Sequence, residues 1–192
     1  MSAPHAYQAG ALALGALGIA SVAASLLPAR TLSQPTKRTA LPPTLSHASM
    51  SLRDPRGVQT LCPRVGSASF SCGKTDWLTY GTRTLSVHGR DATCTWFHPT
   101  KRHTSIVRYP WVTRQALEQD EVAFALSDRA ASARKAPIHA RVVFGAHAVE
   151  RELAPQRGWQ RVALPNETAS GPLTIEVSTR DSGMAHLCYR LR

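Results

Sequence analysis

The sequence predicts an all-β protein, an antiparallel β-sandwich that follows one apolar N-terminal helix and a proline-rich linker. Short segments of alternating apolar and polar residues recur through the second half of the chain, as half-buried strands require. Clusters of Gly, Pro, Asn, Asp and Ser separate these segments at intervals of roughly eight to twelve residues, as turns in a sandwich do. The expected organisation is a helix over residues 1–29, a linker over 30–63 and the sandwich over 64–192.

The N-terminal segment is apolar enough to cross a membrane. Residues 9–27 contain no Lys, Arg, Asp or Glu, and a helix of that length spans about 28 Å, close to the ~30 Å hydrocarbon core of a bilayer. We expect an uncleaved anchor. The alternatives are a cleaved signal peptide with small residues at Val22-Ala23-Ala24, a transit peptide and a buried apolar helix.

The flanking charges and the cysteines favour opposite membrane orientations. Arg30, Lys37 and Arg38 follow the apolar segment, which by the positive-inside rule favours a cytoplasmic C-terminal domain. Four cysteines in a β pattern favour an oxidising compartment instead. The basic residues are few and lie on the linker, so we give the cysteines more weight. The sequence therefore predicts a single-pass membrane protein whose C-terminal domain is periplasmic or lumenal, and organelle targeting stays open.

Residues 30–63 are expected to form a linker, and the alternation of apolar and polar residues begins after them. Residues 30–63 hold several prolines among Ser, Thr and Arg, and X-Pro steps favour extended chain. One helical turn is expected near residues 113–119, and no internal repeat is visible. Nine strands are expected, at residues 84–88, 93–98, 105–109, 122–126, 138–144, 150–154, 159–164, 173–177 and 187–191.

Four segments in the last third of the chain resemble a known fold family. A strand ending in Gly (Ile138–Gly145) precedes a hairpin partner (Glu150–Leu153), a Gly-Trp strand (Gly158–Leu164) and a Gly-Pro-Leu-Thr-Ile-Glu-Val strand (Gly171–Val177). This series resembles the C-terminal half of galactose-binding-like jelly-roll domains. The resemblance implies a jelly-roll-like sandwich over residues 120–192. It also implies a role in binding carbohydrate, or as an accessory module on membrane and envelope enzymes, but it assigns no ligand residue.

The four cysteines predict two disulfides. Cys62 and Cys72 bracket a short glycine-containing loop, and Cys94 and Cys188 fall in separate expected strands. Four cysteines allow three pairings. We expect Cys62–Cys72 and Cys94–Cys188, the second of which ties the C-terminal strand to the middle of the domain. Zinc binding is the competing interpretation, but neither pair has the C-x2-C spacing of a zinc hook.

No motif in the sequence supplies a reaction. The chain has no G-x-S-x-G, H-E-x-x-H or Walker-type loop, and its carboxylate pairs read as strand-edge charges. Cys94 and His98 share one face of an expected strand, but Pro99 ends that strand, and two ligands in register do not make a metal site. We therefore predict no enzyme activity, no cofactor and no metal. An envelope hydrolase is the less favoured alternative.

Charge and aromatic residues together indicate a ligand. The net charge of +11 favours anionic partners, although the basic residues are scattered and a solvated basic surface is the simpler interpretation. Between residues 77 and 114 aromatic residues cluster together with arginines and a lysine, a mixture that stacks on sugars and pairs with anions. For the tryptophans, the simpler alternative is a place in the core. The candidate ligand-binding residues are Trp77, Tyr80, Arg102, His103 and Trp111.

These observations predict a membrane-tethered, extracytoplasmic module that binds or scaffolds and does not catalyse. Its expected ligand is carbohydrate, in particular an acidic glycan, or another polyanion. Nucleic acid, which the same aromatic and basic mixture suits, is the less favoured partner. The alternative function is an accessory structural subunit of a larger membrane complex, with membrane-protein subunits as partners.

Overall fold

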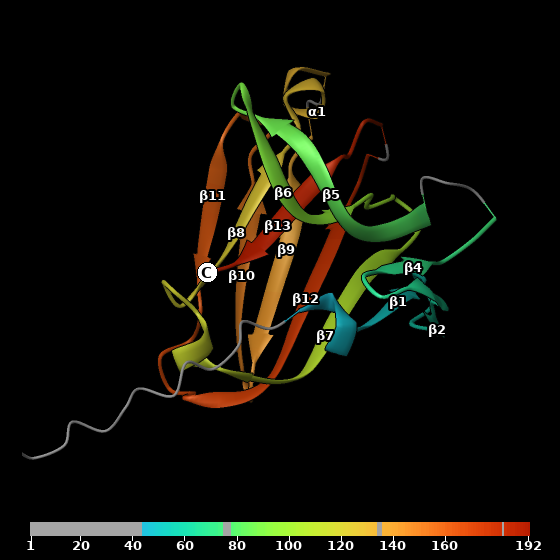
Figure 1. The fold of residues 1–192 in the computed structure, drawn as a ribbon. Helices are drawn as coiled ribbons and strands as arrows, with labels where there is room; N and C mark the ends of the chain where they lie inside the picture. Colours follow the sequence, from blue (N-terminus) through green and yellow to red (C-terminus); the bar gives the residue numbers. More distant parts are fainter. Residues whose placement is uncertain (1–43, 75–77, 134–135, 182) are drawn as a thin grey trace, which may run out of the picture. The chain divides into compact units, whose positions relative to one another are not determined.

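Residues 44–74, 78–133, 136–181 and 183–192 are described by the computed structural model of the chain, which is shown in Figure 1. They form one antiparallel sheet in the order β10-β9-β12-β7-β1-β2 and a second in the order β11-β8-β13-β6-β5-β4-β3. The predicted all-β antiparallel sandwich is confirmed. The expected N-terminal helix at residues 1–29 lies outside the described residues. Within the described ranges, no helix combines the length and the hydropathy of a membrane span.

The strands are short and the helices are minor. The helical elements are η1 (Leu45–His47), η3 (Arg114–Ala116) and α1 (Asp128–Ala133). The strands found in the described residues are β1 (Ser49–Arg53), β2 (Gln59–Leu61), β3 (Arg64–Gly66), β4 (Ser69–Ser71), β5 (Thr79–Val87), β6 (Arg90–Phe97), β7 (Thr104–Thr113), β8 (Glu121–Leu126), β9 (Ile138–Phe144), β10 (His147–Leu153), β11 (Trp159–Ala163), β12 (Ser170–Thr179) and β13 (Leu187–Leu191).

The nine predicted strands correspond to β5 through β13, but the predicted linker is too long. The sequence predicts linker up to residue 63, whereas β1 lies inside the six-stranded sheet, between β7 and β2. Met50 and Leu52 of β1 are buried. The prolines at 55 and 63 flank β2 and mark its turns instead of an extended segment. Helix α1, which the sequence analysis did not predict, follows β8 directly.

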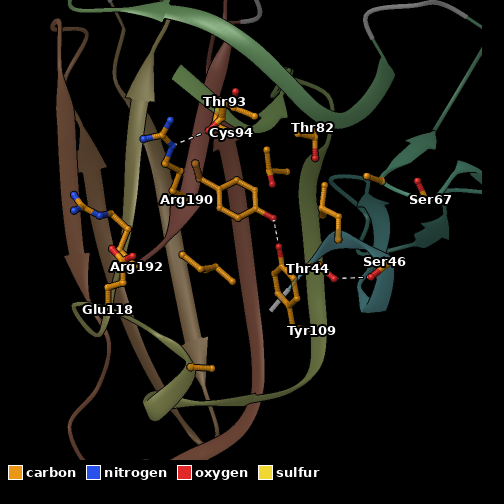
Figure 2. A pocket seen from close by; sticks show the side chains of 16 residues that line it. Thr44, Ser46, Ser67, Thr82, Thr93, Cys94, Tyr109, Glu118, Arg190 and Arg192 are labelled. Carbon is orange, nitrogen blue, oxygen red and sulfur yellow. Dashed lines mark hydrogen bonds between the residues drawn. The ribbon is translucent and has the colours of Figure 1, made fainter. Parts of the chain in front are cut away.

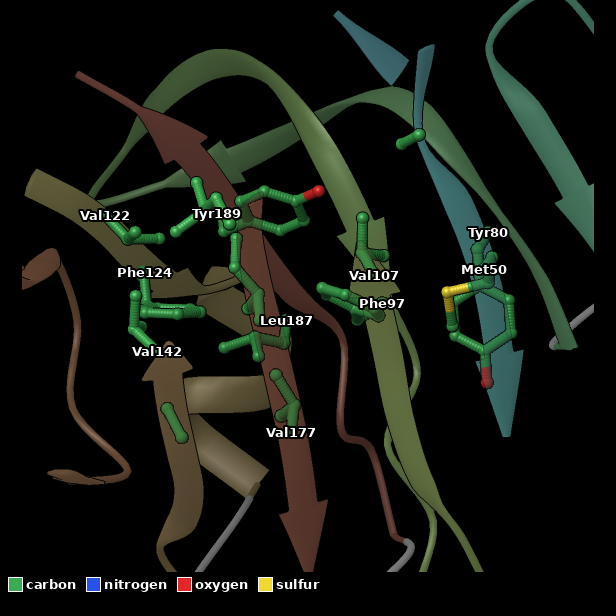
Figure 3. Packing of buried hydrophobic residues seen from close by; sticks show 14 of the residues in the cluster. Met50, Tyr80, Phe97, Val107, Val122, Phe124, Val142, Val177, Leu187 and Tyr189 are labelled. Carbon is green, nitrogen blue, oxygen red and sulfur yellow. The ribbon is translucent and has the colours of Figure 1, made fainter. Parts of the chain in front are cut away.

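The core fills the space between the two sheets, and Figure 3 shows its packing. Burial alternates residue by residue along β9, because one face of that strand points into the sandwich. Phe124, Phe144 and Leu187 are completely buried. Burying a side chain of this size stabilises a fold by about 1.5–3 kcal/mol. The period-two pattern of the sequence therefore translates directly into the inner layer.

The hairpin of β5 and β6 bends over the outer face of its own sheet, and Figure 1 shows it arching across β8 and β11. Near the hairpin tip, Val87 and Ala92 form a second small apolar cluster with Ala125 of β8, against which Trp159 of β11 packs. All six residues of β8 are buried, and on the outer face Ala125 lies under the hairpin. Alanine at position 125 leaves room for this third layer.

A carboxylate fastens the tip of that hairpin. Asp128, the first residue of α1, accepts hydrogen bonds from Ser86 Oγ at 2.6 Å and from the backbone N–H groups of His88 at 2.7 Å and Gly89 at 2.9 Å. His88 and Gly89 have φ values of 52° and 72°, the left-handed region that a tight hairpin turn requires. The Ser86 hydrogen bond first, and then the Gly89 N–H, lower the pKa of Asp128 below its usual range.

Because the pKa of Asp128 is depressed in the folded state, its stabilising contribution is present at neutral pH and is lost as pH falls below about 4. We expect Asp128→Asn to lower the urea midpoint at pH 7, and the difference from the wild type to shrink at pH 3. Urea unfolding at both pH values measures this. Asp91→Asn, an exposed change in the same hairpin, is the matched control. A difference that is equal at both pH values would contradict the assignment.

Both predicted disulfides are present. Cys62 bonds to Cys72 and Cys94 bonds to Cys188, and the described residues contain no free cysteine. Cys94–Cys188 joins β6 to β13 on the outer face of the seven-stranded sheet, close to the point where the hairpin bends away. The Cys94–Cys188 disulfide therefore anchors the base of the hairpin, while hydrogen bonds to Asp128 hold its tip.

Candidate functional site

The structure separates the predicted ligand-binding residues. Trp77 lies outside the described residues. Tyr80 is only 1% exposed and packs against Trp96 and Phe97, with ring centroids 6.3 and 5.7 Å away, so its ring does not reach a ligand at the surface. Trp111 is 64% exposed near the end of β7.

Arg102 and His103 lie at the other end of β7. They immediately precede its first residue, and at about 3.3 Å per strand residue the distance from His103 to Trp111 is about 26 Å. A single binding face that joins Trp111 to Arg102 and His103 would have to run along the whole strand. The described structure brings Arg102 and His103 together and leaves Trp111 apart from them.

The loop from β6 to β7 presents its basic residues at a tight turn. Pro99 follows the last buried residues of β6, and an isolated bridge between Thr100 and His103 closes the turn. The backbone N–H of Arg102 donates to Thr100 Oγ1 at 3.3 Å. Lys101 and Arg102 are consequently exposed at the tip.

Residues from two other strands border this turn. A small hollow of about 90 Å³ is lined by the turn, by Arg53 at the end of β1 and Asp54 after it, and by Ser178 and Thr179 of β12. Ser178 and Thr179 also line a second hollow, of about 340 Å³, whose wall includes Arg180. The shared lining makes one continuous surface. We call Lys101, Arg102, His103 and Arg180 the basic loop end.

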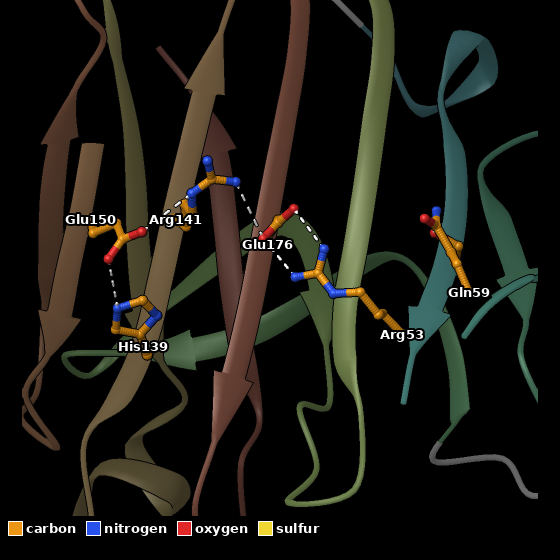
Figure 4. A network of polar contacts seen from close by, with 7 residues as sticks. Arg53, Gln59, His139, Arg141, Glu150 and Glu176 are labelled. Carbon is orange, nitrogen blue, oxygen red and sulfur yellow. Dashed lines mark hydrogen bonds and ion pairs between the residues drawn. The ribbon is translucent and has the colours of Figure 1, made fainter. Parts of the chain in front are cut away.

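Two carboxylates beside the basic loop end, Glu176 and Asp54, are paired with arginines, whereas Glu152, which lines the same hollow as Arg180, forms no ion pair among the described residues. Figure 4 shows Glu176 between Arg53, 2.9 Å away, and Arg141, 3.6 Å away. Asp54 pairs with Arg56 at 3.1 Å. Desolvation works to raise the pKa of Asp54, but hydrogen bonds from the Val58 N–H and from Arg56, with the nearby His103, hold it below its usual range. Asp54 is therefore an anion at neutral pH, and it forms its ion pair with Arg56.

A chain of ion pairs crosses the outer face of the six-stranded sheet. Along it, Glu150 lies 3.5 Å from His139 and 3.2 Å from Arg141, which continues to Glu176 and Arg53 (Figure 4). In contrast, no carboxylate of the described ranges forms an ion pair with Lys101, Arg102 or Arg180. Unpaired positive charge in this region therefore lies in its loops, and on the sheet face at the exposed Arg108 of β7, which forms no ion pair within the described ranges.

The chemistry of the basic loop end is that of an anion site. Cationic side chains next to the hydroxyls of Thr100 and Ser178 can hold a carboxylate, sulfate or phosphate group. Among the residues that the structure describes, no group of three or more His, Cys, Asp and Glu side chains could hold a metal ion.

The sequence alone does not predict Ser178 and Arg180 as members of this surface. They belong to the end of β12 and the turn after it, far along the chain from Arg102. The only local signal was a turn cluster, Arg180-Asp181-Ser182-Gly183, after a well-patterned strand. Antiparallel pairing of β12 with β7 is what brings the two segments together.

Comparison with models of protein families finds no family that matches the chain, and comparison with curated proteins finds no similar sequence. The geometry of the described residues therefore carries the functional assignment.

Proposed function

We propose that the chain is a non-catalytic binding module that holds an acidic glycan or another polyanion at the basic loop end. One observation carries this proposal. Lys101, Arg102 and Arg180 are exposed around one surface and form no ion pair with a described carboxylate, while the neighbouring Glu176 and Asp54 are paired with other arginines. The net charge of +11 adds a long-range attraction for anionic ligands.

The order of the strands supports a jelly-roll-like fold of the galactose-binding type. From β6 to β13, successive strands fill two four-stranded groups, β6-β13-β8-β11 and β7-β12-β9-β10. Two such groups, built from eight strands, are typical of a jelly roll. In this arrangement the β6–β7 and β12–β13 loops emerge at the same end of the sandwich, which is where the basic loop end lies. The fold locates the surface but does not itself assign a ligand.

The cellular setting is part of the proposal. Two disulfides support an oxidising compartment, periplasmic or lumenal. Residues 1–29, outside the described residues, would tether the module to a membrane. The alternative function, an accessory subunit of a membrane complex, has one feature in its favour: Val58, Leu61 and Val65 are exposed apolar side chains close to Cys62.

The test is binding of fluorescent dextran sulfate, with neutral dextran as the reference ligand. We expect the wild type to bind dextran sulfate and the affinity to fall as salt rises, because exposed ion pairs are screened. The triple variant Lys101→Ala, Arg102→Ala, Arg180→Ala should bind about tenfold more weakly, since each exposed pair contributes about 0.2–1 kcal/mol. Fluorescence anisotropy measures both effects.

A charge-matched control separates a local site from the overall charge of the protein. Arg108→Ala, Arg151→Ala and Arg161→Ala also remove three exposed cations, but from strands away from the basic loop end. We expect this variant to keep most of the wild-type affinity. Equal losses in the two triple variants would show that only net charge matters, and the proposed site would be abandoned.

A further inference from the structure

One segment of the chain forms an edge of each sheet. Residues 58–66 pass from β2, the last strand of the six-stranded sheet, to β3, the last strand of the seven-stranded sheet. We call them the edge segment. Four large apolar side chains are exposed in the described residues, and three of them belong to it: Val58, Leu61 and Val65. The Cys62–Cys72 disulfide fastens the edge segment to the chain that follows β4.

The backbone of β2 has an open side. The N–H of Cys62 donates to the carbonyl of Met50 at 2.8 Å, so the backbone groups of residue 62 face β1. Backbone groups alternate between the two sides of an antiparallel strand, and those of Gln59 and Leu61 therefore face away from β1. No backbone hydrogen bond within the described ranges reaches them on that side. An edge of this kind is a template for a further strand.

A groove of about 580 Å³ runs beside this edge. Leu52 lies opposite Thr60 in the β1–β2 ladder and is buried, so the face of β2 that carries Thr60 borders the groove. A strand added to β2 would place every second side chain in the groove and the others on the outer face of the sheet. The lining is mainly apolar and includes Leu52, Val58, Leu61, Cys62, Cys72 and Leu78.

A larger hollow, of about 830 Å³, opens where β6 separates from β13 (Figure 2). Its polar groups bond to one another. The hydroxyls of Tyr109 and Tyr189 are 2.7 Å apart, and those of Thr84 and Thr93 are 3.1 Å apart. Arg190 Nε donates to the carbonyl of Thr93 at 2.7 Å. The open edge of β2 differs from this hollow, because its backbone groups have no such partner within the described ranges.

The charge around the edge segment is positive. Residues 44–74 contain four Lys and Arg residues and one carboxylate, Asp54, which pairs with Arg56 at 3.1 Å. Arg64 and Lys74 form no ion pair with a described residue. The groove also reaches the basic loop end, because Asp54 and His103 line both the groove and the hollow there. This charge favours an acidic partner and disfavours a second copy of the chain, whose net charge is also +11.

We propose that β2 binds an extended, acidic segment of a partner protein as an additional antiparallel strand. The main chain of the partner exchanges hydrogen bonds with Gln59 and Leu61, and its apolar side chains enter the groove. Its acidic residues follow the apolar ones, because the C-terminal end of an antiparallel partner lies beside the β1–β2 turn and the basic loop end. Only this last contact rests on the proposed function, and the strand pairing is independent of it.

The test titrates the full-length, ¹⁵N-labelled protein with an acetylated octapeptide, Thr-Val-Thr-Val-Thr-Asp-Asp-Glu. We expect this probe, at millimolar concentration, to shift the amide resonances of Gln59 and Leu61 and to slow hydrogen exchange at Leu61. Unmoved resonances would overturn the proposal. Slow exchange at Leu61 in the free protein would overturn it as well, because another part of the chain would then cover the edge.

Two N-methylated forms of the probe test the geometry of the pairing. Valines that enter the groove direct their N–H groups away from β2, whereas the threonines between them direct theirs toward it. N-methylation of the threonines should therefore weaken binding at least about tenfold, and N-methylation of the valines should change it less than about threefold. Equal effects of the two modifications would contradict an added strand.

Two substitutions at one position test the edge from the side of the protein. Leu61→Pro removes the outward N–H, and proline is tolerated on an edge strand. Leu61→Thr removes the apolar side chain and keeps the N–H. We expect the proline variant to bind the probe at least about tenfold more weakly and the threonine variant to lose less than about threefold. Equal losses would contradict strand pairing. Thermal melts verify that both variants are folded.

The edge and the basic loop end fail independently. Leu61→Pro should bind dextran sulfate as the wild type does, because Leu61 does not line the hollow at the basic loop end. A loss of dextran sulfate binding in this variant would mean that the probe binds only through its charge, and would overturn the strand site. Probe binding without dextran sulfate binding would uphold the strand site and remove only the polyanion function.

Sedimentation measures whether a second copy occupies the edge. We expect the wild type to show no dimer that depends on β2. A dimer that is present in the wild type and lost in Leu61→Pro would assign the edge to self-association and overturn the proposal.

Discussion

Replacing both Cys94 and Cys188 with alanine is expected to lower the free energy of unfolding by about 4.7 kcal/mol. The two cysteines are separated by 94 residues, and closing a loop of that length restricts the unfolded chain by about that amount. Alanine is preferred to serine because Cys188 is completely buried, and a serine hydroxyl there would need a hydrogen-bond partner. Urea denaturation at neutral pH measures the loss.

The second disulfide provides the matched control. Cys62 and Cys72 are only 10 residues apart, so the same model gives about 2.7 kcal/mol for the double alanine variant. The larger loss should come from Cys94–Cys188, together with increased hydrogen exchange in the β5–β6 hairpin that it anchors. If the two variants lost equal stability, loop closure would not explain the effect. Peptide mapping without reduction, on protein from its native host, would also show whether the compartment is oxidising.

The strands that could be predicted are those whose own residues alternate clearly between apolar and polar. Ile138–Phe144 alternates in burial as it alternates in sequence, because one face meets the core and the other meets solvent. β8 was predicted as a strand for the same reason, but its second buried face was not. Ala123 and Ala125 are too small to indicate burial. Ala125 is covered by a hairpin from another part of the chain, which no local pattern reveals.

The short strands β1 to β4 were missed for a different reason. Three of them have only three residues, so a period of two has no room to appear. β1 has two apolar residues, Met50 and Leu52, among prolines and polar residues that are typical of linkers. Its place between β7 and β2 depends on long-range pairing, which sets the strand in the sheet even though its own signal is weak.

The candidate site shows the same division between local and long-range information. Composition pointed to basic and aromatic residues between positions 77 and 114, and Arg102 and His103 do lie at a surface loop. The phase of alternation along β5 could not be read from the sequence, so the burial of Tyr80 was not foreseen. The contribution of Arg180 follows from the pairing of β12 with β7, far beyond the reach of a local motif.

Truncating two aromatic side chains should change the stability by very different amounts. Phe124 is completely buried in the core between the sheets, where its ring lies 6.2 Å from that of Tyr189. Phe124→Ala should therefore lower the free energy of unfolding by about 3–5 kcal/mol. Trp111 is 64% exposed, and Trp111→Ala should change it by less than about 0.5 kcal/mol. Urea titrations of the two variants beside the wild type measure both values.

The same Trp111→Ala variant decides how far the anion-binding surface extends. Trp111 lies about 26 Å along β7 from the basic loop end, so its removal should leave the affinity for dextran sulfate unchanged. A stable Trp111→Ala variant with weakened binding would mean that a long polyanion follows the strand and stacks on the indole, restoring the single face that the sequence predicted. Unchanged binding, together with the loss in the Lys101, Arg102 and Arg180 variant, would confine recognition to the loops. The exposed indole would then need a different partner.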